Sequence, residues 1–565
     1  MTNRIYSVLF AAIVILGGCK KDFLERYPLD AFVDEAYWTN ENSVRTFSYG
    51  FYTAYFVGYS SGFSGFGRYF TSQSLNDDFA PTSPTQFTRN VPTSGGGWSF
   101  TFVRKANLFI NRVQTVPMDE EAIKHWTGVG RFFRAMEYGD LVKSFGDVPW
   151  YGKELTPTDE ELYKPRQPRT LVMDSVLSDF KYAAENVRLS DGNDGLTVNR
   201  FVVLAFMSRI FLFEGTFLKY HNINLAKSKE YLEVAQWAAN EIMKSGKFSI
   251  TDEYRSLFNS LDLAGKKEII MYRKYETGLV THSLHSYVNK EPQTGASKDA
   301  VESFLAKDGL PISVSPLYKG DKTIADVMTD RDPRLTETFA PDLRLTGIAT
   351  NYSTSGYAVR KFYNEALKDG LEGNGQLNIT DAPVIRYGEV LLNYAEATAE
   401  LGLLTQADLD KSINLLRARP GINIPKLQVV GGQPAITGKV YDDPKRDQSV
   451  SSLLWEIRRE RRTELLFEGF RLEDLKRWKK LEYTDTQAKP DINKGAWIKR
   501  SNYPGLLASV KIENDAPEGY IIPAPSAASQ RLFTDPKVYL DPLPLDQIKL
   551  YQDRGVTLMQ NPGWQ

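Results

Sequence analysis

A single cysteine, Cys19, is present among the 565 residues of this chain. One thiol cannot close a disulfide, so no disulfide framework holds the fold, and a metal site with two thiolate ligands is excluded. Stability must therefore come from buried apolar surface. The composition supplies it, because 42% of the residues are hydrophobic and 25% are charged, which is typical of a folded globular protein rather than of a disordered chain.

The cysteine closes a segment that has the features of an export signal. Arg4 supplies a positive start, and residues 7–16 form an apolar core that is too short to span a membrane. Residues 16–19 read LGGC and resemble the lipobox of bacterial lipoproteins. We predict a signal peptide over residues 1–18 and lipid attachment at Cys19, against the alternative of a plain secretory signal.

The charges nearly cancel, with 69 Lys and Arg against 70 Asp and Glu, which argues against a nucleic-acid partner. Phosphate-binding glycine loops and the GxSxG element of serine hydrolases are missing from the sequence. His282 and His285 are three residues apart, but no acidic third ligand follows at a recognised spacing, so we predict neither a metal site nor a cofactor.

Two clusters of charge have ordinary explanations. The pair Asp77-Asp78 could in principle serve glycoside hydrolysis, although 70 acidic residues produce such pairs by chance. The basic run 458–462 is flanked by glutamates, and the spacing predicts i,i+3 ion pairs Glu456–Arg459 and Arg461–Glu464 on a helix rather than a polyanion site.

Apolar residues recur at three- and four-residue spacing in six segments, which predicts amphipathic helices. The segments are 123–145, 171–187, 201–218, 225–244, 390–402 and 453–479. Some are joined by brief connectors, like tetratricopeptide units. Long polar or glycine-rich stretches separate them, at about 58–97, 277–378, 420–450 and 483–544. We predict a mostly α-helical single domain over residues 19–565, with elaborate loops.

Aromatic side chains crowd the first of these loops and suggest a ligand surface. A sugar ring stacks its apolar face on an aromatic ring while polar neighbours take its hydroxyls. The alternative is that these aromatics form a small core beneath the loop. Trp98 is equally read as a stacking residue or as a core tryptophan that anchors the next helix. The candidate ligand-binding residues are Arg68, Tyr69, Asp78, Trp98, Tyr287 and Tyr318.

Several motifs, in order along the whole chain, resemble the SusD/RagB family of Bacteroidetes outer-membrane lipoproteins. They are Asp22-Phe23-Leu24-Glu25, Trp98 with Ala106-Asn107, Arg131 to Ala135, Phe145 to Pro149, Arg331 to Leu335, Arg386-Tyr387, Tyr394 to Ala397, Glu464 to Trp478 and Gln560 to Trp564. Two motifs depart from the family pattern, since the tyrosine region near Trp98 holds Phe102 or Val103, and Trp564 replaces the usual tyrosine.

The resemblance implies a mostly helical, non-enzymatic binding protein on the cell surface. Such proteins sit as a lid on a SusC-like TonB-dependent transporter in the outer membrane and pass captured glycans to it for import. Peptide capture by the same fold is the first alternative. A surface glycoside hydrolase is a weaker one, and a pure repeat scaffold would leave the aromatic loops unexplained.

Overall fold

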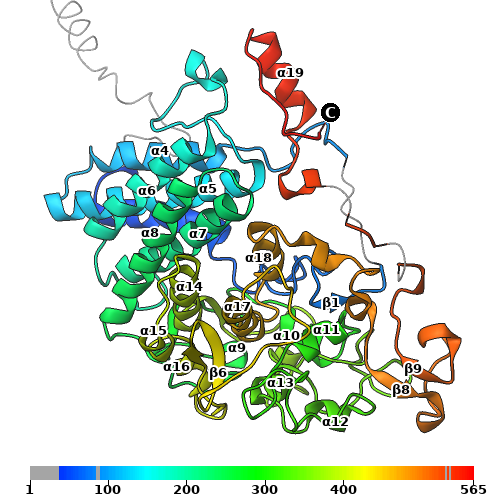
Figure 1. Ribbon diagram of the computed structural model, residues 1–565. Coiled ribbons are helices and arrows are strands. Elements are labelled where there is room, and N and C mark those ends of the chain that lie inside the picture. The colour runs from blue at the N-terminus through cyan, green and yellow to red at the C-terminus, as the bar shows by residue number, and fades with distance from the viewer. Residues whose placement is uncertain (1–36, 84–89, 528–530, 534–535, 565) are drawn as a thin grey trace, which may run out of the picture.

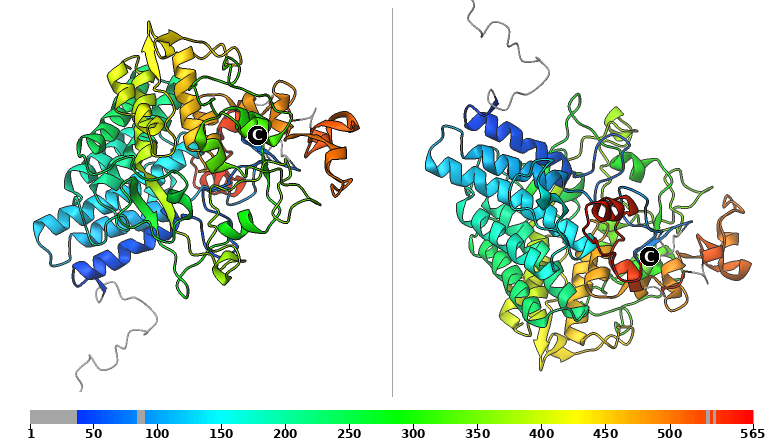
Figure 2. Two further views of the ribbon diagram at one scale, coloured as in Figure 1. Left: turned by 90° about the horizontal axis from the view of Figure 1, so that it is seen from below. Right: turned by 90° about the horizontal axis from the view of Figure 1, so that it is seen from above.

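The computed structural model describes residues 37–83, 90–527, 531–533 and 536–564. The predicted signal peptide and Cys19 lie outside the described residues. Within them the fold is mostly helical, as predicted, with a block of long helices beside a region of short elements and loops (Figure 1). The two further views in Figure 2 show the same division, with the long helices side by side in one layer-like block.

Consecutive helices build the helical block by packing against one another. They are α3 (Glu41–Tyr55), α4 (Thr101–Val113), α5 (Glu120–Phe145), α6 (Arg169–Asn186), α7 (Arg200–Tyr220) and α8 (Leu225–Lys244), with α14 (Tyr387–Glu400) packed on α7 and α8. Four of the six predicted segments match α5, α6, α7 and α8 within a few residues. The predicted segment 390–402 corresponds to α14.

Side chains at the helix ends explain where two of these helices begin. Asn199 precedes α7, and its side-chain oxygen accepts hydrogen bonds from the backbone N–H groups of Phe201 and Val202. Asp119 does the same for α5 by accepting from Ala122 at 2.8 Å. Both arrangements satisfy donors that the first helical turn leaves unpaired.

Helix α7 is the apolar centre of the block. Among the described helices it alone is long and apolar enough to cross a membrane, yet 89% of its most apolar stretch is buried inside the protein. Gly215 lets α8 approach closely, because a Cβ at this position would lie 2.8 Å from the Cγ atom of Leu232. The helix is therefore a core helix of this fold.

Short elements and loops form the second region. Its helices are α9 (Ser256–Asn259), α10 (Leu284–Asn289), α11 (Lys298–Glu302), α12 (Ile324–Met328) and α13 (Pro333–Thr338). Its strands form three antiparallel pairs, β1 (Phe79–Ala80) with β3 (Gly295–Ala296), β2 (Ile269–Arg273) with β4 (Ala382–Arg386), and β8 (Trp497–Lys499) with β9 (Glu518–Tyr520). The stretch 277–378, read as loop, thus contains four short α-helices, the 3-10 helix Leu371–Gly373 and β3.

The stretch 420–450 also differs from its reading as a loop. It holds a three-stranded antiparallel sheet of β5 (Gln428–Val430), β6 (Gln433–Ile436) and β7 (Lys439–Val440), beside α15 (Gln406–Asp410) and α16 (Ile413–Arg417). Gly431-Gly432 and Gly438 supply the two tight turns with positive φ. Glycines that suggested an irregular loop are the turns of a small sheet.

The predicted helix 453–479 is wrong in one respect, because the structure breaks it in two. Helix α17 (Ser452–Glu464) ends at Glu464. Helix α18 (Arg471–Arg477) begins after a turn in which Phe467 and Gly469 have φ angles of 67° and 84°. A Cβ on Gly469 would lie 2.3 Å from the carbonyl oxygen of Arg68. The helix is interrupted so that the backbone of the 58–72 segment can pack against the turn.

Two main hydrophobic cores correspond to the two regions. The first is built by the long helices and includes Phe133 and Leu465, and the second gathers loop residues such as Tyr69 and Leu466. A small third cluster around Leu475 packs near the described C-terminal residues. Since Leu465 and Leu466 are consecutive, the turn after α17 is one place where the chain passes from one core to the other.

A buried ionic network lies at this junction. Both carboxylate oxygens of Glu464 are used, accepting hydrogen bonds of 2.8, 2.8 and 2.9 Å from Arg386, Arg419 and Arg334. None of these side chains has appreciable solvent exposure. Burial by itself would raise the pKa of Glu464, but the three guanidiniums hold it well below its ordinary value.

Only one of the two predicted i,i+3 pairs is present on α17. Arg459 donates to Glu456 at 3.1 Å, as the spacing predicts. Arg461 instead donates to Asp474 on α18 at 2.9 Å, because Glu464 is taken by arginines from three distant segments. The basic run is thus neutralised within the protein, as expected.

Candidate functional site

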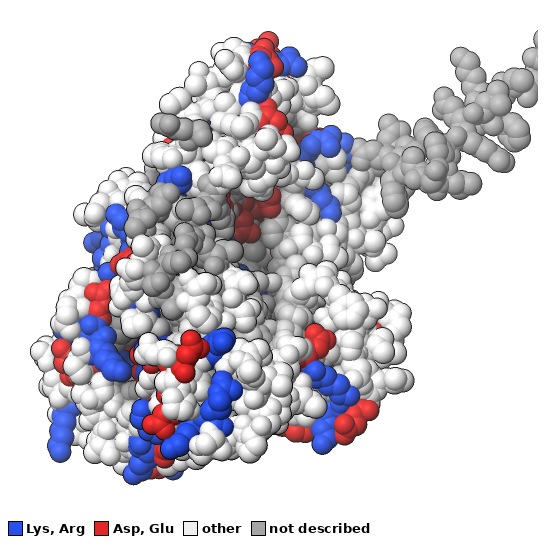
Figure 3. All heavy atoms as spheres, turned by 90° about the vertical axis from the view of Figure 1, so that its right-hand side faces the viewer, with Lys and Arg blue, Asp and Glu red and all other residues white. Residues whose placement is uncertain are grey.

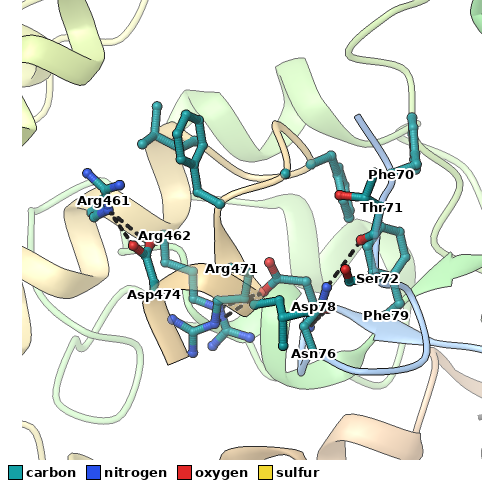
Figure 4. A pocket seen from close by; sticks show the side chains of 15 residues that line it. Phe70, Thr71, Ser72, Asn76, Asp78, Phe79, Arg461, Arg462, Arg471 and Asp474 are labelled. Carbon is teal, nitrogen blue, oxygen red and sulfur yellow. Dashed lines mark hydrogen bonds and ion pairs between the residues drawn. The ribbon is translucent and has the colours of Figure 1, made fainter. Parts of the chain in front are cut away.

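Asp78 lies beside Arg462 of α17 and Arg471 of α18 (Figure 4), and the preceding residue, Asp77, pairs with the same two arginines. Arg471 donates two hydrogen bonds of 2.6 Å to the Asp77 carboxylate, and Arg462 donates to Asp78 at 2.8 Å. Burial would raise the pKa of Asp77, but Arg462 and Arg471 hold it well below its ordinary value. Asp77 is therefore an ionised, paired carboxylate.

The cavity beside this acidic pair is small. The cavity lined by Asp78, Arg462 and Arg471 has a volume of about 20 Å³, which is enough for one water molecule. Glycoside hydrolysis needs two carboxyl groups on either side of a bound sugar ring. Asp77 and Asp78 lack that space, and their oxygens are used by arginines. The pair holds the 76–79 segment against α17 and α18.

A larger cavity of about 390 Å³ lies between α5, α7, α18 and the 54–72 segment. Its apolar wall includes Phe206 and Phe213, and its charged groups are already paired: Lys143 donates to Glu473 at 2.9 Å, and Arg68 lies 3.3 Å from the same carboxylate. The predicted residue Arg68 thus faces a cavity, with its guanidinium 4.7 Å above the Phe470 ring.

Charges of both signs are interspersed over one face of the protein. Figure 3 shows the face that lies to the right in Figure 1, where basic and acidic side chains alternate and a recess has acidic side chains at its base. No single sign dominates this face, in keeping with the formal net charge of −1. A polyanionic partner would find no continuous basic surface here.

Trp98 and Tyr69 lie in the two cores. Trp98 is 7% exposed and packs edge-on against Phe100 and Phe145, with ring centroids 5.4 and 5.0 Å away. The hydroxyl of Tyr69 donates to the carbonyl oxygen of Pro383 at 2.6 Å, and its ring is buried in the second core. Both arrangements leave little ring surface for a ligand in this conformation.

Tyr287 and Tyr318 are half-buried and lie in different places. Tyr287, on α10, accepts a hydrogen bond from the backbone N–H of Thr294, and its ring lies 4.9 Å from that of Phe66. The Tyr318 ring is covered by the guanidinium of Arg331 at 5.6 Å. Burial raises the pKa of Tyr318 to about 12, and the nearby carboxylates of Glu302 and Asp321 add to the effect.

Two aromatic residues are paired in the small β8–β9 sheet, beside Asp321, a carboxylate that also raises the pKa of Tyr318. Trp497 and Tyr520 are directly opposite in the β8–β9 pair, and both are half-buried. Ile498, between Trp497 and Lys499, is buried in the second core, so alternation along β8 turns the Trp497 ring outward. Directly opposite residues project from the same face of a sheet, so the two rings offer apolar surface on that face, which we call the aromatic platform. The ammonium groups of Lys298 and Lys494 also lie 5.2 and 5.1 Å from the Tyr520 ring.

Polar groups surround the platform. The ammonium of Lys322 lies over it, 4.8 Å from the Trp497 ring and 5.7 Å from Tyr520. The Tyr520 hydroxyl donates to Asp321 at 2.6 Å, and Lys298 lies 3.8 Å from the same carboxylate. An apolar surface with donors and acceptors along its edge is what a sugar ring requires.

The sequence reading missed this platform. Trp497 and Tyr520 are 23 positions apart in a stretch classed as irregular because of its prolines. The signal present is a short period-2 pattern, in which Ile498 is buried between two outward residues and Ile521 is buried after Tyr520. Strands of three residues are too short for that pattern to stand out.

His282 and His285 are structural side chains. His282 is fully buried, with Nε2 3.0 Å from the carbonyl oxygen of Thr380 and Nδ1 accepting from the backbone N–H of Leu284. His285 has its Nε2 3.0 Å from the carbonyl oxygen of Asn364. No cluster of three or more metal-ligating side chains occurs in the part of the chain that the structure describes.

Comparison with known proteins decides the family. The profile described as the SusD family matches residues 268–564, which is more than half of the chain. The chain belongs to the SusD family. The match includes β2, α14, the α17–α18 turn and the platform strands, and the resemblance found in the sequence is thereby confirmed.

Relatives of this SusD-family chain extend over nearly its full length. SusD-like protein P38 of Formosa agariphila is 24% identical over 520 residues, which is 84% of this chain and 91% of the relative. A SusD-like carbohydrate binding protein from Bacteroides fragilis has a TM-score of 0.67 at 22% identity, covering 91% and 99% of the two chains. Surface glycan-binding protein A from Bacteroides fluxus has a TM-score of 0.59 at 17% identity, covering 93% and 100%. These solved structures share the fold.

Proposed function

We propose that this SusD-family protein is a lipid-anchored, cell-surface protein that captures glycans and delivers them to a SusC-like TonB-dependent transporter of the outer membrane. The aromatic platform, Trp497 and Tyr520 with Lys322 and Asp321 at its edge, is the observation that carries the proposal. Support also comes from the names of two solved relatives, one a carbohydrate binding protein and one a surface glycan-binding protein.

Binding without chemistry is enough for this role. A sugar ring stacks on the platform, and the exposed Lys322 ammonium moves aside to donate to its hydroxyls while Asp321 accepts. The Asp321 carboxylate at this edge also raises the pKa of Tyr318. The proposal assigns no acid, base or nucleophile, in agreement with a family of binding proteins.

Calorimetric titration of the chain from residue 20 against neutral oligosaccharides tests the platform. Trp497→Ala removes the larger ring and is expected to weaken the binding of a glycan at least tenfold. Trp237→Ala is the matched control, because Trp237 is 45% exposed on α8, away from the platform strands. Equal affinity of wild type and Trp497→Ala would place the glycan elsewhere.

The earlier candidate Trp98 needs a separate variant. Trp98→Phe keeps an aromatic ring in the core contact with Phe145, so the fold should survive. Unchanged glycan affinity in this variant would assign Trp98 to the core. A loss comparable to that of Trp497→Ala would show that Trp98 contacts the ligand.

Anchor and partner have their own tests. Cys19→Ala should move the protein from the membrane fraction to the soluble fraction and abolish labelling by radioactive palmitate. Mild detergent extraction should co-purify a large β-barrel protein with the wild type. Peptide in place of glycan in that complex, identified by mass spectrometry, would favour the peptide-importing alternative. Release of reducing sugars from a polysaccharide panel would favour the hydrolase alternative.

A further inference from the structure

A second pocket of about 270 Å³ opens in the loop-rich region, formed by the segments 340–344 and 351–365 and by the end of α10. Its polar lining residues are Asp342, Arg344, Asn351, Arg360, Tyr363 and Glu365. A pocket of this size suits one sugar unit rather than a chain.

Two arginines face this pocket with most of their donors unused. Arg344 donates from Nε to Asp342 at 3.2 Å and from Nη1 to Asn351. Among the described residues, the Arg360 guanidinium has one hydrogen-bonding partner, Glu365 at 3.4 Å. Each guanidinium carries five N–H donors, so more than half of these donors remain for a ligand.

The contrast with the other arginines of this chain is marked. At the core junction Arg386 makes hydrogen bonds to Glu268, Glu464 and Glu468 and is nearly unexposed. The side chains of Arg344 and Arg360 are each more than a quarter exposed. Glu365 also accepts from Arg255, at 2.7 Å, so two arginines share its one carboxylate.

The aromatic wall of the pocket is fixed in place. Tyr363 is stacked on the buried His285, with an interplanar angle of 7° and ring centroids 5.4 Å apart. Tyr287, a residue that the sequence singled out, precedes the pocket residue Val288 on α10. A held aromatic ring beside two guanidiniums suits a ring-shaped ligand that carries an anionic group.

We infer that this pocket binds an anionic sugar unit, a pyranose with a carboxylate or a sulfate, whose charged group is held by Arg344 and Arg360. This inference rests on the proposed glycan function for the kind of ligand. The guanidinium fork accommodates both oxygens of a carboxylate or two of a sulfate, which a neutral hydroxyl cannot reproduce. The pocket would then select acidic glycans, while the platform holds the neutral part of a chain.

The test titrates the chain from residue 20 with tri-galacturonate and with its methyl ester, in which the carboxyl groups carry no charge. The acid is expected to bind at least tenfold more tightly than the ester. Arg360→Gln loses only a 3.4 Å contact to Glu365, so it should stay folded, and it should weaken acid binding at least tenfold without changing the ester. Arg360→Lys keeps the charge without the guanidinium fork, so its affinity for the acid should lie between those of the wild type and Arg360→Gln.

Controls separate this inference from the function on which it rests. Arg446→Gln, at a partly buried arginine paired with Asp442 outside this pocket, should leave acid binding unchanged. Trp497→Ala should weaken neutral glycans only. Galactose 6-sulfate and galacturonate, tested alone, identify which anion is preferred. Equal affinity for acid and ester, or full affinity in Arg360→Gln, overturns the anionic pocket, and neutral glycan binding lost in Trp497→Ala would still support the proposed function.

Discussion

The substitution Glu464→Gln tests whether the buried charges at the core junction hold the two regions together. The carboxylate accepts three charge-assisted hydrogen bonds, from Arg334, Arg386 and Arg419, at 2.8–2.9 Å. An amide of the same shape removes the charge and turns an NH₂ group toward guanidinium donors. Removing one partner from a buried ionic cluster costs about 3–5 kcal/mol, because the remaining charges stay buried.

That free energy converts into a modest shift of the melting temperature. With about 2.1 cal/mol/K of unfolding entropy per residue, roughly 500 folded residues give about 1 kcal/mol/K. A cooperative unfolding transition should therefore move down by about 3–5 °C in scanning calorimetry, and urea unfolding should show the same free-energy loss. Shifts are larger in small domains, since their unfolding entropy is smaller.

The control is Glu233→Gln on the exposed surface of α8, where Glu233 lies 3.8 Å from Lys229. Exposed pairs of this kind contribute about 0–1 kcal/mol, so its melting temperature should change by less than about 1 °C. If Glu464→Gln behaves like this control, the network is not a stabilising connection between the cores, and the reasoning is refuted.

Three further predictions concern acid stability and packing. Burial lowers the pKa of His282 to about 3, so between about pH 6.5 and 3 only the unfolded chain gains this proton, and stability falls with acidification. In urea unfolding at pH 4–6, His282→Asn should reduce the slope of the unfolding free energy against pH by about 1.4 kcal/mol per pH unit. Gly215→Val places a Cβ 2.8 Å from Leu232 and should cost about 1–3 kcal/mol in the same assay. Trp98→Ala should cost about 3–5 kcal/mol, and unchanged urea unfolding would contradict its burial.

Periodicity predicted the long helices because their packing is local. The apolar spacing of 225–244 gives α8 with the same bounds, since its buried face contacts its neighbour α7 in sequence. The break between α17 and α18 could not be predicted in this way. It depends on the Arg68 carbonyl, which comes from a segment about 400 residues earlier in the chain.

Candidate site residues were harder to predict because partners are chosen in three dimensions. Asp78 looked like a polar ligand group, but Arg462 neutralises it from α17. Trp98 had the right residue type, and it packs against Phe145. The residues that form the platform and the arginine pocket carry no motif, because strand pairing and loop packing bring them together.

The ionic junction also determines how this protein can respond to a ligand. Glu464 and its three arginines lie where Leu465 and Leu466 divide between the cores, so moving one core relative to the other would separate charges that water cannot reach. We therefore expect the two cores to keep their relative positions when a ligand binds. Association should cost little conformational entropy, and specificity should depend on how well a glycan fits surfaces that exist before it arrives.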